Sequence, residues 1–229
     1  MVRARMLLVG AVLMPSVLFG QTPASAPPDS VFYAVSYVET RAPATTAARA
    51  ALEQYRDASR RQDGLVRVEC FEQIGRPGHF AVVETWRDQK AFDARDAAAQ
   101  KQLLGALQPI RVSDYDQRPY KTLTTAPGSA SAGGRQAVYV VAHVDVTQSP
   151  QVPLMLRRLA EASRQEAGNL RFDVLQHMTR ANHFTVIEGW RSQEALDSHA
   201  AAAHTRQYRD ELQPMTGSPL DERVYTPVE

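Results

Sequence analysis

The sequence has little of three things that would narrow its function at once: cysteine, charge of one sign, and long apolar runs. Among 229 residues Cys70 is the only cysteine, so no disulfide can form within the chain. The 26 basic residues nearly balance the 25 acidic ones, which gives a net charge of +1, and the two signs are interspersed. We therefore expect no nucleic-acid partner and no attraction to an anionic membrane surface.

One uncharged apolar run is present, from Met6 to Phe19. Two arginines precede it, small residues follow it, and it is shorter than the roughly 20 residues that a membrane-spanning helix needs. The pattern predicts a signal peptide over residues 1–26, cleaved after Gly20 or after Ala26. We expect a secreted or periplasmic protein with no stable membrane anchor after cleavage.

Motifs that hold metal ions are also missing. The sequence contains no HExxH and no CxxC, and no carboxylate–histidine group stands at ligand spacing. We therefore predict no metal site, and a site assembled from separate strands stays open as the alternative. Cys70 alternates with Val66 and Val68 along an apolar strand face, which indicates a buried structural thiol rather than a nucleophile.

What the sequence does contain is a duplication. The segment "HFAVVETWRDQKAFDARDAAAQ" at 79–100 recurs as "HFTVIEGWRSQEALDSHAAAAH" at 183–204, with 12 of 22 positions identical. A stretch rich in small residues, 124–136, separates the copies and is typical of a linker. We predict one domain over 31–123 and a second over 137–228.

Each copy has the same pattern of elements: strand, helix, strand, strand, helix, strand. This is the ferredoxin-like order, so we predict an α+β fold in which two βαββαβ units pack their antiparallel sheets into a pseudo-dimeric α/β barrel. The alternative is two separate units that each pair with another molecule, and a further homodimer stays open. The predicted strands begin at Val31, Leu65, His79, Ala137, Asn169 and His183. The first helix of each copy is predicted over 44–61 and about 150–167. The second helix of each copy is predicted to begin after Asp88 or Ser192 and to continue to Pro109 or Pro214.

Alternation along the second strand of each copy places charged residues on one face. Arg171 and Asp173 lie opposite Phe172, and Arg67 and Glu69 repeat this in the first copy. If the charged faces look into the barrel, the sheets enclose a polar chamber. Gly64 and Gly168 follow the first helices, at positions where a helix C-cap needs positive φ.

Five of the six histidines belong to the second copy: His143, His177, His183, His199 and His204. His199 and His204 flank the apolar stripe of the last helix and lie about 140° apart on a continuous helix, which is poor geometry for sharing a metal ion. Their counterparts in the repeat are Arg95 and Gln100. His183 recurs as His79 at a turn, which indicates a structural role, and His177 is expected to be exposed.

The stretch "EAGNLRFDVLQ…HFTVIEGWRSQEALDSHAAAAH" resembles the antibiotic biosynthesis monooxygenase (ABM) family of dimeric α/β barrels. The matching features are Glu166 and Gly168 after the first helix, Phe172, Glu188 with Trp190, and His199 in the last helix. The resemblance implies oxygenation without metal, flavin or other cofactor, in which the substrate supplies the electrons. It also implies a small phenolic or quinol-type aromatic and O2 as partners. Haem-degrading relatives of this fold bind the iron through a histidine further along the last helix. No histidine follows His204, so the resemblance disfavours haem.

We therefore expect an exported cofactor-independent monooxygenase with one working site, in the second domain. The alternative is a non-catalytic exported protein that binds a small molecule in the same barrel. His199 is the candidate base or proton relay and His204 the second candidate. The candidate substrate-binding residues are His143, Phe172, Glu188, Trp190 and Tyr208.

Overall fold

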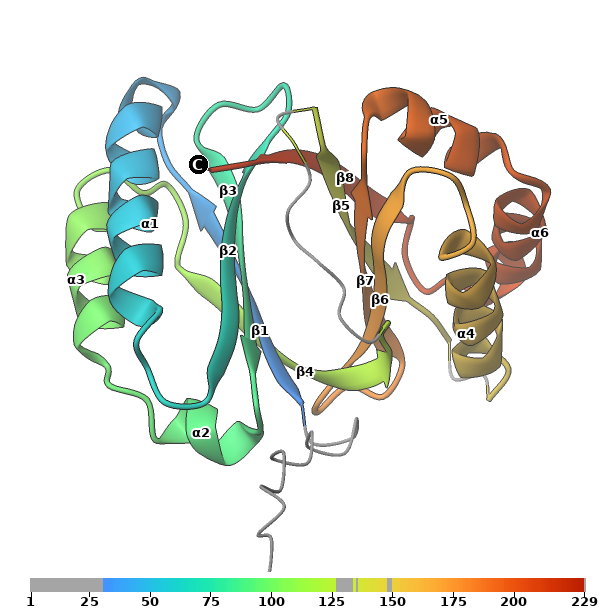
Figure 1. The fold of residues 1–229 in the computed structure, drawn as a ribbon, viewed down its shortest axis with the longest axis horizontal. Helices are drawn as coiled ribbons and strands as arrows, with labels where there is room; N and C mark the ends of the chain where they lie inside the picture. The colour runs from blue at the N-terminus through green and yellow to red at the C-terminus, as the bar shows by residue number, and fades with distance from the viewer. Residues whose placement is uncertain (1–30, 127–133, 135, 148–149, 229) are drawn as a thin grey trace, which may run out of the picture.

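The computed structural model describes residues 31–126, 134, 136–147 and 150–228. In them eight antiparallel strands form one closed barrel in the order β1-β3-β2-β8-β5-β7-β6-β4. Helices cover the barrel on two opposite sides, with the first copy's helices on one side and the second copy's on the other (Figure 1). The predicted fold is confirmed, and both units of the pseudo-dimer lie in one chain.

The two copies have matching elements. The first contains β1 (Phe32–Glu39), α1 (Thr45–Ser59), β2 (Leu65–Gln73), β3 (His79–Trp86), α2 (Gln89–Asp93), α3 (Ala98–Leu107) and β4 (Asp116–Thr124). The second contains β5 (Val138–Asp145), α4 (Val152–Ser163), β6 (Asn169–His177), β7 (His183–Trp190), α5 (Gln193–Ala201), α6 (Ala203–Leu212) and β8 (Asp221–Pro227).

The barrel closes by hydrogen bonds between strand edges of different copies. β4 pairs with β6 from Tyr120↔His177 to Thr124↔Val174, and β8 pairs with β2 from Phe71↔Pro227 to Gln73↔Tyr225. Each copy thus covers the exposed edge that the other would leave unpaired. This is why the duplicated chain forms one body.

Alternation along each strand divides the side chains between the barrel lumen and the helix-covered outer face. Tyr33, Val35 and Tyr37 of β1 pack in the lumen, where they meet Tyr139 and Val141 of β5. The residues between them face the helices, and in the second copy these form a core with α4 and α6. The position of the candidate site depends on this division.

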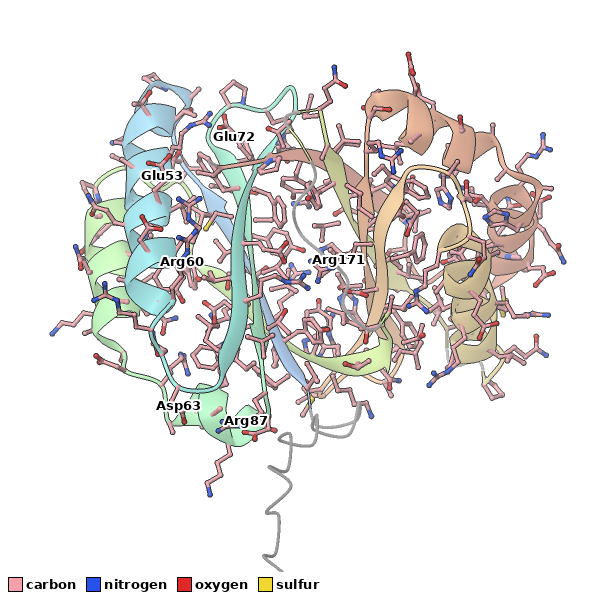
Figure 2. The ribbon with its side chains drawn as sticks, viewed as in Figure 1. Glu53, Arg60, Asp63, Glu72, Arg87 and Arg171 are labelled. Atoms are coloured by element: carbon pink, nitrogen blue, oxygen red, sulfur yellow. The ribbon has the colours of Figure 1, made fainter. Side chains whose placement is uncertain are left out.

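The charged faces of β2 and β6, whose direction the sequence left open, look into the lumen. Arg171 lies between the two halves (Figure 2) and is 1% exposed. Its Nη1 donates to Glu69 Oε2 of the first copy at 2.7 Å, and its Nε donates to Asp173 Oδ2 at 2.6 Å. The expected polar character of the lumen is present as a buried ion-pair network that joins the copies.

Local signals near the helices are mostly confirmed. Asp88 and Ser192 cap α2 and α5 by accepting from the backbone N–H of Ala91 and Ala195. Gly168 has the predicted positive φ, +91°, but it is not a helix C-cap: α4 ends at Ser163 with Arg164 as its cap, and Gly168 lies in the turn directly before β6. Val66, however, is 67% exposed instead of sharing the buried face of Cys70, because a bulge shifts the register of β2 between Leu65 and Arg67.

The second helix of each copy, expected to be continuous, is broken in two. In the second copy the break lies at Ala202, whose backbone is extended at φ −63° and ψ 147°. The predicted signal peptide lies outside the described residues, and so does most of the predicted linker. None of the helices in the described part of the chain has the length and apolar character to cross a membrane.

Candidate functional site

A cavity of about 200 Å³ lies in the second copy, between the outer face of the sheet and the helices α5 and α6. For comparison, a cavity of about 150 Å³ accommodates benzene. Its walls are largely apolar, with a few polar groups that converge on it. The apolar lining is Val140, Ala142, Val144, Leu159, Val186, Leu196, Ala200, Leu220 and Val224; the polar lining is Gln193, Asp197, Glu188, His199, Thr205, Tyr208, Arg209 and Glu222.

Glu188 of β7 presents a buried carboxyl group to the cavity. Alternation places it on the same outer face as Trp190, whose Nε1 donates to Glu188 Oε2 at 2.8 Å. Burial raises the pKa of Glu188 to about 7, although the Trp190 hydrogen bond acts in the opposite direction. A carboxyl group with this pKa can give or take a proton near neutral pH.

His199 lies beside this carboxyl group, near the end of α5. Its ring stacks on Trp190 with centroids 4.6 Å apart, and its Nε2 is 3.8 Å from Glu188 Oε2. On the other side Nδ1 is 2.6 Å from Glu166 Oε1. Burial lowers the pKa of His199, although the bond to Glu166 opposes this. A neutral ring that donates from Nδ1 to Glu166 keeps its basic lone pair on Nε2, toward Glu188.

His204 reaches the same glutamate from α6. Its Nε2 is 3.0 Å from Glu166 Oε1, and the rings of His199 and His204 are 5.8 Å apart. The prediction that these histidines diverge was wrong, because it assumed a continuous helix. The extended residue Ala202 redirects the chain between them, so both rings turn to one carboxylate.

Tyr208, one turn further along α6, has a buried hydroxyl group. The side chain is 8% exposed and lines the cavity, and its Oη has no hydrogen-bond partner among the described residues. A buried hydroxyl without a partner costs free energy. This oxygen is therefore placed where a ligand in the cavity could bond to it, and the role of Tyr208 in substrate binding stays a prediction.

The first copy fills the corresponding place. Tyr55 of α1 donates its hydroxyl to Glu84, the counterpart of Glu188. The second copy has Leu159 where the first has Tyr55, and Leu159 is part of the cavity wall. The smaller side chain, with no hydroxyl, leaves Glu188 facing open space.

The histidine cluster is also replaced in the first copy. Gln62 stands in place of Glu166, and Arg95 in place of His199, where it bonds to the backbone oxygen of Phe92. The ten residues of α3 match α6 at an offset of 105, because one residue is missing between α2 and α3. The counterpart of His204 is thus Ala99, rather than Gln100 as the ungapped repeat suggested.

The remaining histidines of the second copy lie in the barrel lumen, away from the cavity. His143 bonds to the Tyr37 hydroxyl at 2.7 Å, and burial lowers its pKa to about 3. His183 bonds to Asp145 at 2.6 Å, in line with a structural role. His177, expected to be exposed, is 9% exposed because β4 pairs alongside it at Tyr120.

The structure thus separates the predicted site residues. It brings His199, Glu188, Trp190 and Tyr208 together, and Phe172 packs its ring edge-on against His199 at 5.6 Å. His204 joins them through Glu166, whereas His143 belongs to the lumen. Residues not predicted for the site are Glu166, Leu159, Thr205, Arg209 and Glu222. Only Glu166 had a signal in the sequence, as the acidic residue before Gly168.

Glu166, His199 and His204 could also hold a metal ion. Each offers one ligand atom, and these atoms lie within 4.8 Å of one another. The sequence prediction of no metal site rested on the spacing along the chain, which does not show that Glu166 approaches from the loop before β6. Among the described residues this is the group of His, Cys, Asp and Glu side chains that converges in this way.

The fold and cavity define a class: tandem ferredoxin-like units that close one α/β barrel and offer a small, mainly apolar pocket with acid–base groups. The family model for antibiotic biosynthesis monooxygenase matches residues 31–101 and 137–211, which is more than half of the chain. The chain therefore belongs to the ABM family, with two tandem domains. It is 29% identical over 63 residues to YcnE of Bacillus subtilis (strain 168), named as a candidate monooxygenase; this stretch covers 28% of our chain and 66% of YcnE, just under two thirds.

Solved structures share the whole fold. A candidate monooxygenase from Fusobacterium nucleatum subsp. nucleatum superposes with a TM-score of 0.77 over 87% of this chain and 93% of its own, at 14% identity. One from Lactobacillus acidophilus gives 0.71 over 87% and 95%, also at 14% identity. An anthrone oxidase-like protein gives 0.62 over 88% and 92%, again at 14% identity. At these identities the likeness shows the fold alone.

Proposed function

We propose that this protein is an exported, cofactor-independent monooxygenase that oxidises a small phenolic or quinol-type aromatic with O2, at one working site in the second domain. The observation that carries the proposal is the line of groups Glu166–His199–Glu188 beside an apolar cavity that the first copy fills with Tyr55. Family membership supports the reaction class, and the apolar run at the N-terminus supports export.

The cavity fits the chemistry of such a substrate. A phenol has a pKa of about 10, so its electron-rich anion forms at neutral pH only if a base takes the proton. Nε2 of His199 is that base, held in place by Glu166 and by the stacked ring of Trp190. Tyr208 and Glu188 offer hydrogen bonds to substrate oxygens. The apolar walls exclude water from the anion.

The electrons come from the substrate itself. One hydroquinone and one O2 give one hydroxybenzoquinone and one water, so the ring loses four electrons and O2 gains four. One oxygen atom forms a new C–O bond, and the other leaves as water with two protons. No external reductant is needed. The protein's part is to take the hydroxyl proton, exclude solvent and return protons to the departing oxygen.

The test measures oxygen uptake by the full chain, treated with a chelator, with a panel of hydroquinones and hydroxynaphthalenes. We expect uptake that falls by at least about 100-fold in His199→Ala, the lower end of what general base catalysis contributes. The affinity for the substrate, measured by tryptophan fluorescence, should fall much less. Uptake that is unchanged in His199→Ala contradicts the assignment of the base. Binding without any uptake favours the non-catalytic binding protein instead.

A further inference from the structure

We propose that Glu166, His199 and His204 form a binding site for one divalent transition-metal ion of the Zn²⁺ type. The two imidazoles and the carboxylate come from the loop before β6, from α5 and from α6. Both imidazole nitrogens approach the same oxygen, Glu166 Oε1, at 2.6 and 3.0 Å. Two histidines and one carboxylate form a common ligand set for zinc, with a fourth position left open.

The three ligand atoms are near enough to one another to hold an ion after shifts of less than about 1 Å. Zinc binds imidazole nitrogen and carboxylate oxygen at about 2.0–2.2 Å, which in tetrahedral geometry puts the ligand atoms roughly 3.3–3.5 Å apart. The contacts of 2.6 and 3.0 Å are shorter than this by about 0.3–0.9 Å, as hydrogen bonds are, and all three ligand atoms lie within 4.8 Å of one another. An ion would replace the two imidazole protons that now point at Glu166. His204 and Glu166 keep 30% and 17% of their side chains exposed, so both have room to move outward.

A second contact supports the site independently. Histidines that bind metal through one nitrogen usually present the other N–H to a carboxylate, which orients the ring. If His199 binds the ion through Nδ1, its Nε2–H faces Glu188 Oε2 at 3.8 Å. The stacked Trp190 ring holds this orientation from one side. At 3.8 Å this contact is longer than a hydrogen bond, so Glu188 stands near Nε2 and would have to move closer to accept its proton in the loaded site.

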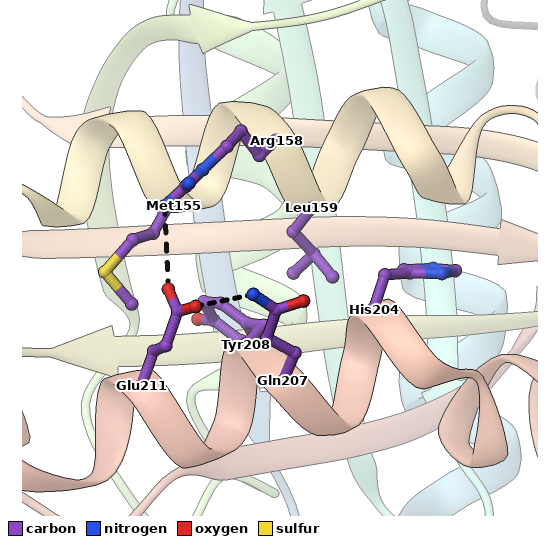
Figure 3. Close-up of a pocket in the computed structure, with 7 residues that line it drawn as sticks. All are labelled: Met155, Arg158, Leu159, His204, Gln207, Tyr208 and Glu211. Atoms are coloured by element: carbon purple, nitrogen blue, oxygen red, sulfur yellow. Dashed lines mark hydrogen bonds and ion pairs between the residues drawn. The ribbon is translucent and has the colours of Figure 1, made fainter.

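The ion also has a way in. His204 lies at one end of a crevice between α4 and α6, beside Leu159 (Figure 3), and the crevice opens to the surface. Glu211 lies further along the same crevice, paired with Arg158 at 3.5 Å. An ion can thus approach His204 from solvent without passing through the cavity next to Glu188.

The first copy offers an internal comparison. At the places of Glu166, His199 and His204 it has Gln62, Arg95 and Ala99, none of which binds such an ion well. Arg95 also puts a permanent positive charge where His199 stands in the second copy. The two copies share the fold, and side chains cap α2 and α5 at matching positions, so the ligand set is not a requirement of the fold.

The test titrates chelator-treated full chain with Zn²⁺ by calorimetry and with Co²⁺ by visible absorption, in the absence of any substrate. We expect one ion per chain and the visible bands of a four-coordinate Co²⁺. Glu166→Gln and His204→Ala should each weaken binding at least 10-fold, while His79→Gln in the first copy should leave it unchanged. Thermal unfolding of each variant checks that it is folded. If His204→Ala does not fold, the near-isosteric Glu166→Gln alone provides the test.

No binding by the wild-type chain, or equal binding by wild type and Glu166→Gln, overturns the proposal. Equal weakening by His79→Gln also overturns it, because it would indicate adventitious binding. None of these readouts requires turnover, so the metal site stands or falls separately from the proposed oxygenase.

If the proposed oxygenase function holds, metal binding at this site has a consequence for activity. A metal ion on Nδ1 leaves the proton on Nε2, which removes the lone pair that would take the substrate proton. Zn²⁺ should then inhibit oxygen uptake, and a chelator should restore it.

Discussion

Leu159 of α4 and Tyr55 of α1 occupy matching places in the two copies, 104 residues apart. Tyr55 donates its hydroxyl to Glu84, whereas Leu159 leaves the cavity open in front of Glu188. The two copies also differ at Gln62, Arg95 and Ala99, so this exchange is one of several that distinguish the second copy's cavity. Each residue-scale prediction below changes one such side chain.

Leu159→Tyr should close the cavity of the second copy. The new ring would take the space in front of Glu188, as Tyr55 does before Glu84, so we expect binding of a hydroquinone to weaken at least 10-fold in a fluorescence titration. Leu159→Met is the matched control, because it nearly conserves volume and should cost less than about 1.5 kcal/mol of stability. Unchanged binding in Leu159→Tyr would mean that the ligand lies elsewhere.

The buried carboxyl group of Glu84 should make the stability of the protein depend on pH. Burial raises the pKa of Glu84, against the opposing hydrogen bonds from Tyr55 and Trp86. The folded state therefore holds its proton more tightly than the unfolded state, so stability falls as pH rises from the unfolded value, about 4.3, through the folded pKa.

Glu84→Gln keeps the shape without the ionisation, so this loss should disappear. We expect the melting temperature of Glu84→Gln, relative to wild type, to increase between pH 4 and pH 8. Asp114→Asn, at a 97% exposed carboxylate, is the control and should show little such trend. A constant difference between Glu84→Gln and wild type across this range contradicts the proposed cause.

At the scale of elements, the turn from each first helix into the next strand has one tight position. Gly168 has φ +91°, and a Cβ built there would lie 2.7 Å from Ala195 Cβ of α5. Both the backbone angle and the contact oppose a side chain. This turn also fixes Glu166, two residues earlier, against α5 and the histidines.

Gly168→Ala should therefore lower the free energy of unfolding by about 1–3 kcal/mol. The matched control is Gly105→Ala in α3, where a Cβ meets no atom within 4 Å. There the substitution should stabilise by about 0.5–1 kcal/mol, because alanine favours helix. Urea unfolding measures both changes. A neutral Gly168→Ala would show that the turn can relax away from α5.

The break between α5 and α6 is the second local feature that positions the histidines. On one continuous helix His199 and His204 would point about 140° apart. The extended backbone of Ala202 removes this divergence and lets both rings reach Glu166. The first copy has a similar break between α2 and α3 but no histidines beside it. The break therefore belongs to the fold, and the second copy adds the side chains that use it.

At the scale of the whole molecule, the two copies are joined by strand pairing and by one buried ion-pair network. Arg171 of the second copy binds Glu69 of the first, and Arg67 contacts the same Glu69 carboxylate at 3.1 Å. Asp173 supplies the second negative charge. Buried charges are tolerated when they are paired, and removing Arg171 takes away the one positive charge that contacts both carboxylates.

Arg171→Met should accordingly cost about 3–5 kcal/mol, because Glu69 and Asp173 would stay buried without their shared partner. Arg111→Met removes an exposed pair with Asp114 and should change stability by less than about 1 kcal/mol. Denaturant unfolding compares the two variants. If Arg171→Met costs no more than Arg111→Met, the network does not hold the halves together.

The sequence by itself determined the architecture. The duplication can be read directly from the chain, and the order of strands and helices, the shared face of Arg171 and Asp173, the caps at Asp88 and Ser192, and the positive φ at Gly168 follow from patterns within a few residues. Such patterns are reliable because backbone sterics and alternation act between near neighbours. They also supplied the family resemblance and the candidates His199 and Glu188.

Only the tertiary structure decided where the candidate site lies and which residues surround it. The sequence suggested a chamber between the two sheets, but His199 and Glu188 meet on the outer face, under the helices. Glu166 reaches His199 across 33 residues, and the burial of His177 depends on a strand from the other copy. Contacts of this kind depend on how whole elements pack and on where a helix breaks, and neither is set by the residues next to them in the chain.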